Sequence, residues 1–148
     1  ILEKRCKMLK KISKFIEEVK QEVNKDDFKR AQYVIDEKQR VLDVCNALQH
    51  DDYETVGRCM YGTHDGMSRL YEVSCDELDF LNDIARQCGV TGSRVMGGGF
   101  GGCTINLVKD ELRTAFIEKA KQAFAQRFGH EPKVYEVAIS DGARKITE

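Results

Sequence analysis

Residues 93–108 read Ser-Arg-Val-Met-Gly-Gly-Gly-Phe-Gly-Gly-Cys-Thr-Ile-Asn-Leu-Val. The run 93–96 is short and apolar in part, and the run 103–108 alternates and is rich in β-branched residues, so both are typical of strands. Between them stand five glycines and one phenylalanine: Gly97, Gly98, Gly99, Phe100, Gly101 and Gly102. Short strands joined by a tight turn favour antiparallel pairing, so we expect a strand-loop-strand unit here.

Five glycines in six positions are costly, because glycine loses more conformational entropy on folding than any other residue. The loop therefore indicates a need for positive φ angles or for a close approach of the backbone. Successive exposed backbone amides in such a turn can form a concave anion site, the usual way to cradle a phosphate. A tight turn without any ligand is the alternative interpretation.

Three known nucleotide motifs do not fit the loop. Gly97, Gly99 and Gly102 match G-x-G-x-x-G, but a dinucleotide fingerprint needs a helix after the loop, and the next segment is a strand. A Walker A loop needs Gly-Lys-Ser or Gly-Lys-Thr, which is absent. A protein-kinase glycine loop suits the strand-loop-strand setting, yet the chain has neither H-R-D nor D-F-G.

Helical periodicity dominates the first half of the chain. Apolar residues recur at steps of three and four over 9–23, 28–48, 53–70 and 78–88. We expect Asp26-Asp27 to cap the second helix and a Ser74/Glu77 capping box to start the fourth, which Gly89 then ends.

Beyond the loop, a long helix over 110–128 is predicted, with Asp110 as its cap and Gly129 as its end. Residues 133–139 alternate as a strand should. We therefore predict an α+β fold: a helical first half, 1–90, then strand-loop-strand-helix-strand over 91–148, with a ferredoxin-like antiparallel sheet. The whole of 1–148 is expected to be a single domain.

Composition limits the function classes. Of 148 residues, 41% are apolar and 33% charged, and the net charge of −1 argues against a nucleic-acid partner. No segment is apolar enough for a membrane span, and no signal peptide is recognisable. The first residue is Ile1, so we expect a portion of a longer protein. Six scattered cysteines without zinc-site spacing are expected to be reduced thiols in a cytoplasmic protein.

The run 94–104 resembles the third, C-terminal glycine motif of galactokinases, members of the GHMP kinase superfamily. Tyr-Glu-Val-Ser-Cys at 71–75 and Glu-Leu-Asp at 77–79 reinforce the resemblance, which extends from about residue 33 to residue 144. Two departures stand out. Met96 replaces a frequent threonine. The usual Ser, Arg and Asp between the histidine and the tyrosine are replaced, with Gly66, Ser68 and Arg69 in that stretch.

The resemblance implies that the parent enzyme transfers the γ-phosphoryl group of ATP, with Mg²⁺, to the 1-hydroxyl of galactose. The galactose signature, the catalytic Asp and Arg, and the main ATP loop are absent from this sequence. We therefore expect this chain to be the C-terminal domain alone, to be inactive by itself, and to have a missing N-terminal kinase domain as its partner.

By the same resemblance, 97–102 would line the inter-domain cleft, with Asp141 and Arg144 as possible neighbours and no catalytic or metal-binding residue in this fragment. His64 is expected to be a hydrogen-bonded helix residue, and Tyr71 and Phe100 to be packing residues. Two other functions stay open, a small-molecule-sensing module and a protein-interaction platform. Both predict that the glycine loop is dispensable.

Overall fold

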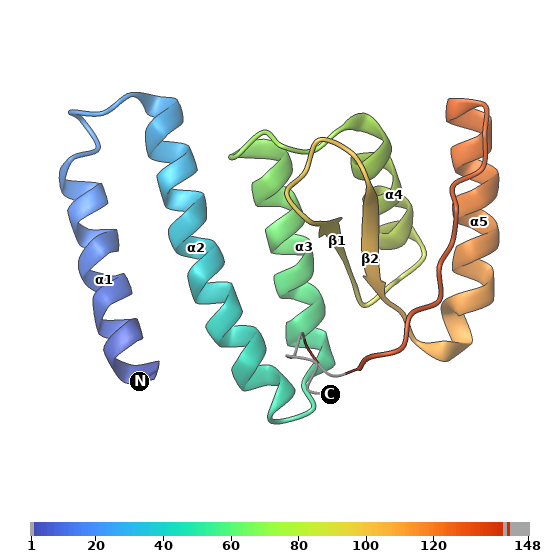
Figure 1. The fold of residues 1–148 in the computed structure, drawn as a ribbon, viewed down its shortest axis with the longest axis horizontal. Coiled ribbons are helices and arrows are strands. Elements are labelled where there is room, and N and C mark those ends of the chain that lie inside the picture. The colour runs from blue at the N-terminus through green and yellow to red at the C-terminus, as the bar shows by residue number, and fades with distance from the viewer. Residues whose placement is uncertain (1, 141, 143–148) are drawn as a thin grey trace, which may run out of the picture.

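The first three helices lie side by side in the computed structural model, which describes residues 2–140 and 142. They are α1 (Leu2–Glu18), α2 (Lys25–Leu48) and α3 (Tyr53–Arg69). α1 packs on α2, and α2 packs on α3 (Figure 1). The helical first half predicted from periodicity is therefore confirmed.

The second half forms a hairpin held between helices. After α4 (Asp76–Gln87), β1 (Gly92–Met96) pairs antiparallel with β2 (Cys103–Leu107), in a register that runs from Gly92 opposite Leu107 to Met96 opposite Cys103. β1 lies on α3 and α4, and α5 (Asp110–Phe128) packs on α4. In the described part of the chain, five helices and a two-stranded antiparallel sheet make an α+β fold, as predicted.

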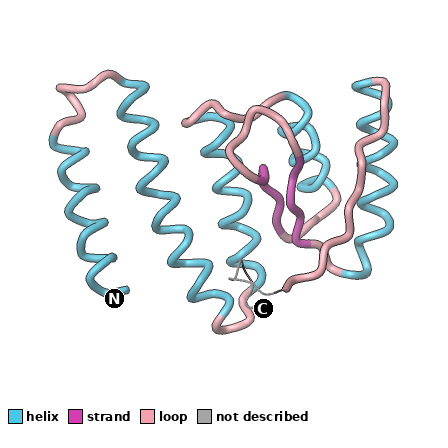
Figure 2. Tube along the Cα trace, in the orientation of Figure 1, coloured by secondary structure: helices cyan, strands magenta, loops and turns pink. Residues whose placement is uncertain are grey.

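The predicted third strand is wrong. Residues 133–139 have no regular secondary structure (Figure 2) and run back along α5 (Figure 1). Glu136 of this segment lies 3.5 Å from Arg113 of α5. Val137 is 78% exposed and Ile139 is fully exposed. The alternation of this segment is not enough for a strand, because a strand also needs a sheet edge with which to exchange hydrogen bonds. The ferredoxin-like sheet is therefore not seen in the described residues.

Three predicted helix starts are displaced by one or two residues. Asn24, not Asp26 or Asp27, caps α2, and its side chain accepts the Asp26 N–H at 2.8 Å. Cys75, not Ser74, occupies the cap position of α4, and Lys109 precedes α5, so that Asp110 is its first residue. The Ser74/Glu77 capping box does not form because Ser74 lies one residue before the cap position, and its hydroxyl donates to Asp79. α1 also ends at Glu18, earlier than expected.

Two apolar clusters make the core. The first joins α2, α3, α4, β1 and the connection between α3 and α4, through Tyr33, Met67, Leu78, Val95 and Val73. The second joins α4 to α5, through Ile84, Ala85, Val90, Phe116 and Ala120. Aromatic contacts of Phe80 with Phe124 and Phe128 extend the second cluster toward the end of α5.

Glycines in α3 allow its neighbours to approach closely. A Cβ on Gly57 would collide with the Thr91 backbone, where the chain enters β1, and a Cβ on Gly66 would collide with the Tyr33 ring of α2. α3 is continuous through these glycines. Two of these glycines serve packing, Gly57 against the start of β1 and Gly66 against α2.

Candidate functional site

The glycine loop, residues 97–102, closes the β1–β2 hairpin. Its φ angles are positive at five positions: Gly97 (86°), Gly99 (97°), Phe100 (62°), Gly101 (123°) and Gly102 (102°). L-residues other than glycine rarely adopt this region because the Cβ atom crowds the backbone. The density of glycine in the sequence is explained by this backbone path.

The loop touches the rest of the protein at the α3–α4 connector, residues 70–75. The Phe100 N–H donates to the Val73 carbonyl oxygen at 2.7 Å. At Gly99 an added Cβ would lie 2.8 Å from the Val73 Cβ and nearer still to the Val73 carbonyl oxygen. Gly99 therefore combines positive φ with a close backbone contact, and it is the position where glycine is most strictly required.

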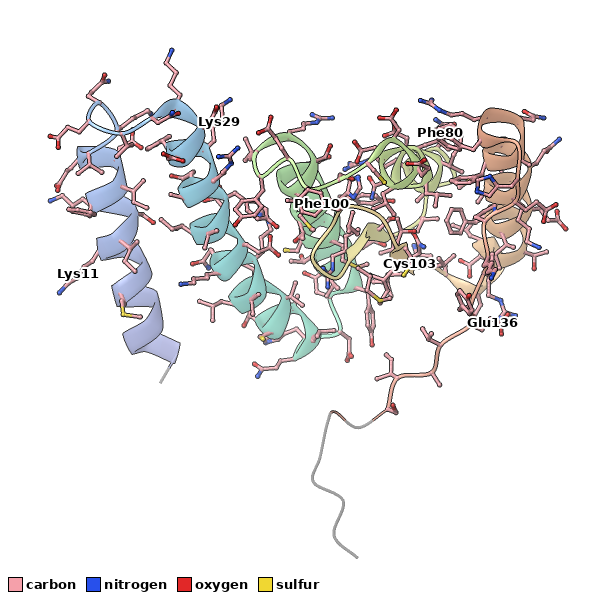
Figure 3. The ribbon with its side chains drawn as sticks, turned by 45° about the horizontal axis from the view of Figure 1, so that its top comes forward. Lys11, Lys29, Phe80, Phe100, Cys103 and Glu136 are labelled. Atoms are coloured by element: carbon pink, nitrogen blue, oxygen red, sulfur yellow. The ribbon has the colours of Figure 1, made fainter. Side chains whose placement is uncertain are left out.

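The rest of the loop is open. A Cβ on Gly97, Gly98, Gly101 or Gly102 would meet nothing within 4 Å. The Phe100 side chain is 79% exposed at the loop (Figure 3), so its predicted packing role is wrong within this chain. The reason is its φ of 62°, because the backbone conformation that lets its N–H reach Val73 leaves the ring in solvent.

Open backbone amides give the loop its chemical character. Within the described residues, Phe100 is the one loop residue whose N–H donates a hydrogen bond to a backbone carbonyl of another segment. Consecutive amides without internal partners suit the oxygens of a phosphate.

The loop does not suit Mg²⁺, which takes carboxylate, carbonyl and water oxygens in octahedral geometry. The loop has no carboxylate, and the described residues contain no group of three or more His, Cys, Asp or Glu placed to hold a metal.

A polar cluster joins the connector to its two flanking helices. It consists of His64 and Ser68 of α3, Ser74 of the connector and Asp79 of α4. Asp79 accepts the Ser68 hydroxyl at 2.8 Å and the Ser74 hydroxyl at 2.5 Å, and its Oδ1 is 3.1 Å from His64 Nε2. His64 is a hydrogen-bonded helix residue, as predicted, but its acidic partner was not foreseen. Asp79 belongs to α4, and only the packing of α4 on α3 brings the two side chains together.

Burial determines the protonation state of His64, which is 3% exposed. Removal from water lowers the pKa of the His64 ring, and the Asp79 carboxylate opposes this only in part. The ring is therefore neutral at pH 7. Since a carboxylate only accepts hydrogen bonds, Nε2 carries the proton and the buried Nδ1 is left without a partner. A residue so buried cannot reach a substrate as a base.

The remaining predicted positions divide into three groups. Tyr71 packs on Tyr33 with ring centroids 5.3 Å apart, as expected. Cys103 and Thr104 begin β2 directly behind the loop. Asp141 and Arg144 lie outside the described residues.

Comparison with known proteins supplies the family. Residues 46–126 match the family model for the C-terminal region of GHMP kinases. The chain is 42% identical to the galactokinase of Clostridium beijerinckii over 80% of this chain, and 40% identical to that of Thermotoga neapolitana over 84%. It also superposes on the Lactococcus lactis galactokinase crystallised with galactose, with a TM-score of 0.68 and 30% identity over 73% of this chain.

The chain spans about a third of the length of the curated relatives it matches, 31% of the Clostridium protein and 38% of the Thermotoga protein, and 28% of the Lactococcus structure. The family match covers more than half of the chain and includes the glycine loop, the connector and the polar cluster. The chain therefore belongs to the GHMP kinase family, as a C-terminal domain of the galactokinase type.

Proposed function

We propose that this chain is the C-terminal part of an enzyme that transfers the γ-phosphoryl group of ATP to the 1-hydroxyl of galactose, and that the glycine loop lines the active-site cleft. The observation that carries the proposal is that most of the loop's backbone is open. Among the described residues only the Phe100 N–H of the loop donates to a backbone carbonyl of another segment, that of Val73, and four of its glycines face open space. Phosphoryl transfer depends mainly on positioning and on neutralising phosphate charge, which open backbone amides can serve.

The partner of the loop is a separate N-terminal kinase domain. We assign to that domain the recognition of galactose, the catalytic residues and the main contacts with ATP and Mg²⁺, because the present sequence has none of the corresponding motifs. Asp141 and Arg144 are proposed as neighbours of the same cleft.

A cytoplasmic setting fits this proposal. The five cysteines whose side chains are described are free thiols. Among the described residues, no helix is both long enough and apolar enough to cross a membrane.

The first test compares the chain alone with the chain joined to a kinase domain. Galactose-dependent ADP release is expected to be absent for the chain alone and present after the N-terminal kinase domain of a galactokinase is fused to residue 1. Turnover by the chain alone would contradict the assignment of the chemistry to the other domain.

The second test uses two adjacent glycines in the fused enzyme. Gly98→Ala places a methyl group in open space without a positive φ, so the free energy of unfolding should stay the same or rise by up to about 1 kcal/mol. Turnover should nevertheless fall at least about tenfold, since a displacement of about 1 Å at a reacting centre can cost 100-fold.

Gly99→Ala is the matched comparison. It should lower both stability, by about 1–3 kcal/mol, and turnover, because the new Cβ collides with Val73 at a positive φ. Normal turnover in the Gly98→Ala enzyme would mean that nothing binds against the loop. That outcome would contradict the proposed role of the loop in the active-site cleft.

A further inference from the structure

The α3–α4 connector is the support of the glycine loop. Val73 is 7% exposed within the first apolar cluster, and its N–H donates to the Met67 carbonyl oxygen of α3 at 2.9 Å. Its own carbonyl oxygen accepts the Phe100 N–H, and Gly99 packs against it. Apart from its attachment to β1 and β2, the glycine loop is therefore positioned by one residue of the connector, Val73.

Asp79 ties the connector to both helices that flank it. The carboxylate is on α4, Ser68 and His64 are on α3, and Ser74 is in the connector immediately after Val73. Both carboxylate oxygens are engaged: Oδ1 by Ser74 and His64, and Oδ2 by Ser68. One side chain therefore restrains three segments, and hydrogen bonds to a charged group are stronger than those between neutral groups.

We propose that Asp79 is a positioning residue for the glycine loop, acting through Ser74 and Val73, and that His64 and Ser68 orient its carboxylate. Asp79 does not contact the loop and is not a catalytic residue. The effect on turnover rests on the proposed function, whereas the effect on the loop itself does not. The alternative role for an acid in the first turns of α4 is simple attraction to the positive end of the helix dipole.

Amide hydrogen exchange of the chain, followed residue by residue by NMR, tests the positioning role without requiring activity. In Asp79→Ala, exchange at the Phe100 and Val73 amides should accelerate at least tenfold, while the paired amides of β1 and β2 change less than threefold. Unchanged exchange at Phe100 would overturn the proposal, and so would equal acceleration at every amide.

Three further variants keep the test decisive if Asp79→Ala folds poorly. Ser74→Ala removes only the link to the connector and should raise Phe100 exchange in a fully folded chain. Asp79→Asn should restore most of the protection, because its amide can keep its oxygen on Ser74 and donate to Ser68. Asp76→Ala removes an exposed acid from the first turn of the same helix and should leave Phe100 unchanged. A result in which Asp76→Ala matches Asp79→Ala would assign the effect to the helix dipole.

Turnover of the fused enzyme separates the two proposals. Asp79→Ala should lower kcat/KM at least tenfold, with recovery in Asp79→Asn. Altered exchange at Phe100 with normal turnover would retain the positioning role and contradict the proposed function of the loop. Normal exchange with reduced turnover would contradict the positioning role alone.

Discussion

His64 links protonation to folding because its ring is almost fully removed from water. Burial lowers the pKa of the ring below its ordinary value, with Arg86 acting in the same direction and Asp79 and Asp65 acting against it. In the unfolded chain the ring regains an ordinary pKa near 6.5. Between the two pKa values the unfolded state binds more protons than the folded state, so stability is lost as the pH falls through this window.

The free energy of unfolding should therefore decrease from pH 7 to pH 5.5 with a contribution from His64 of up to about 1.4 kcal/mol per pH unit. His64→Gln should flatten this dependence, measured by urea denaturation at several pH values. His50→Gln is the control, since His50 is exposed at the end of α2, and it should keep the slope of the parent chain. An unchanged slope in His64→Gln would show that burial does not shift the ring's pKa downward.

At the scale of the element, α3 is the central helix of the molecule. It packs on α2 along one side and on β1 along another, and it carries two members of the polar cluster. Its glycines allow β1 and α2 to approach its backbone closely. Gly57 meets the start of β1 so tightly that a Cβ on Gly92 would lie 2.6 Å from the Gly57 Cα. The hairpin, and with it the glycine loop, is placed by this contact.

Gly57→Ala should therefore destabilise the chain by about 1–3 kcal/mol, because the methyl group collides with rigid backbone rather than with a mobile side chain. Gly62→Ala is the matched control in the same helix. There the Cβ meets the Nε atom of Arg40 at 3.0 Å, which a long side chain can relieve, and alanine has the better helix propensity. Thermal unfolding of both variants checks this, and equal effects would contradict the packing argument.

At the scale of the whole molecule, the segment 133–139 stands apart from the core. Val134, Tyr135, Val137 and Ile139 are exposed, and the ion pair described between the segment and α5, Arg113 with Glu136, lies at the surface. Exposed ion pairs contribute about 0–1 kcal/mol each, too little to hold a segment against its conformational entropy.

The amides of 134–139 should accordingly exchange with solvent at nearly the rate of an unstructured peptide, while those of α4 and α5 are protected. Exchange measured by mass spectrometry on peptides from both regions checks this. Strong protection across 134–139 would show that the segment pairs as a strand in solution, as its alternation alone predicts.

The sequence by itself determined the features that depend on residues close to one another along the chain. The apolar spacing at three and four residues identified five helices, and the glycine density at 97–102 identified a loop that L-residues with side chains cannot follow. Gly89 and Gly129 ended their helices in the left-handed conformation, as predicted. The resemblance to galactokinases also rested on contiguous motifs, and the family match confirmed it.

Only the tertiary structure decided the relations between distant segments. The local pattern predicts Ser74 as the cap of α4, but the folded chain puts Cys75 at that position, and the Ser74 hydroxyl donates to the charged Asp79. The pairing of His64 with Asp79 and the bond from Phe100 to Val73 depend on α3, α4 and the hairpin meeting in space. The predicted strand at 133–139 was wrong for the same reason. Alternating apolar residues can form a buried face, but a strand also needs a neighbouring strand with which to exchange hydrogen bonds.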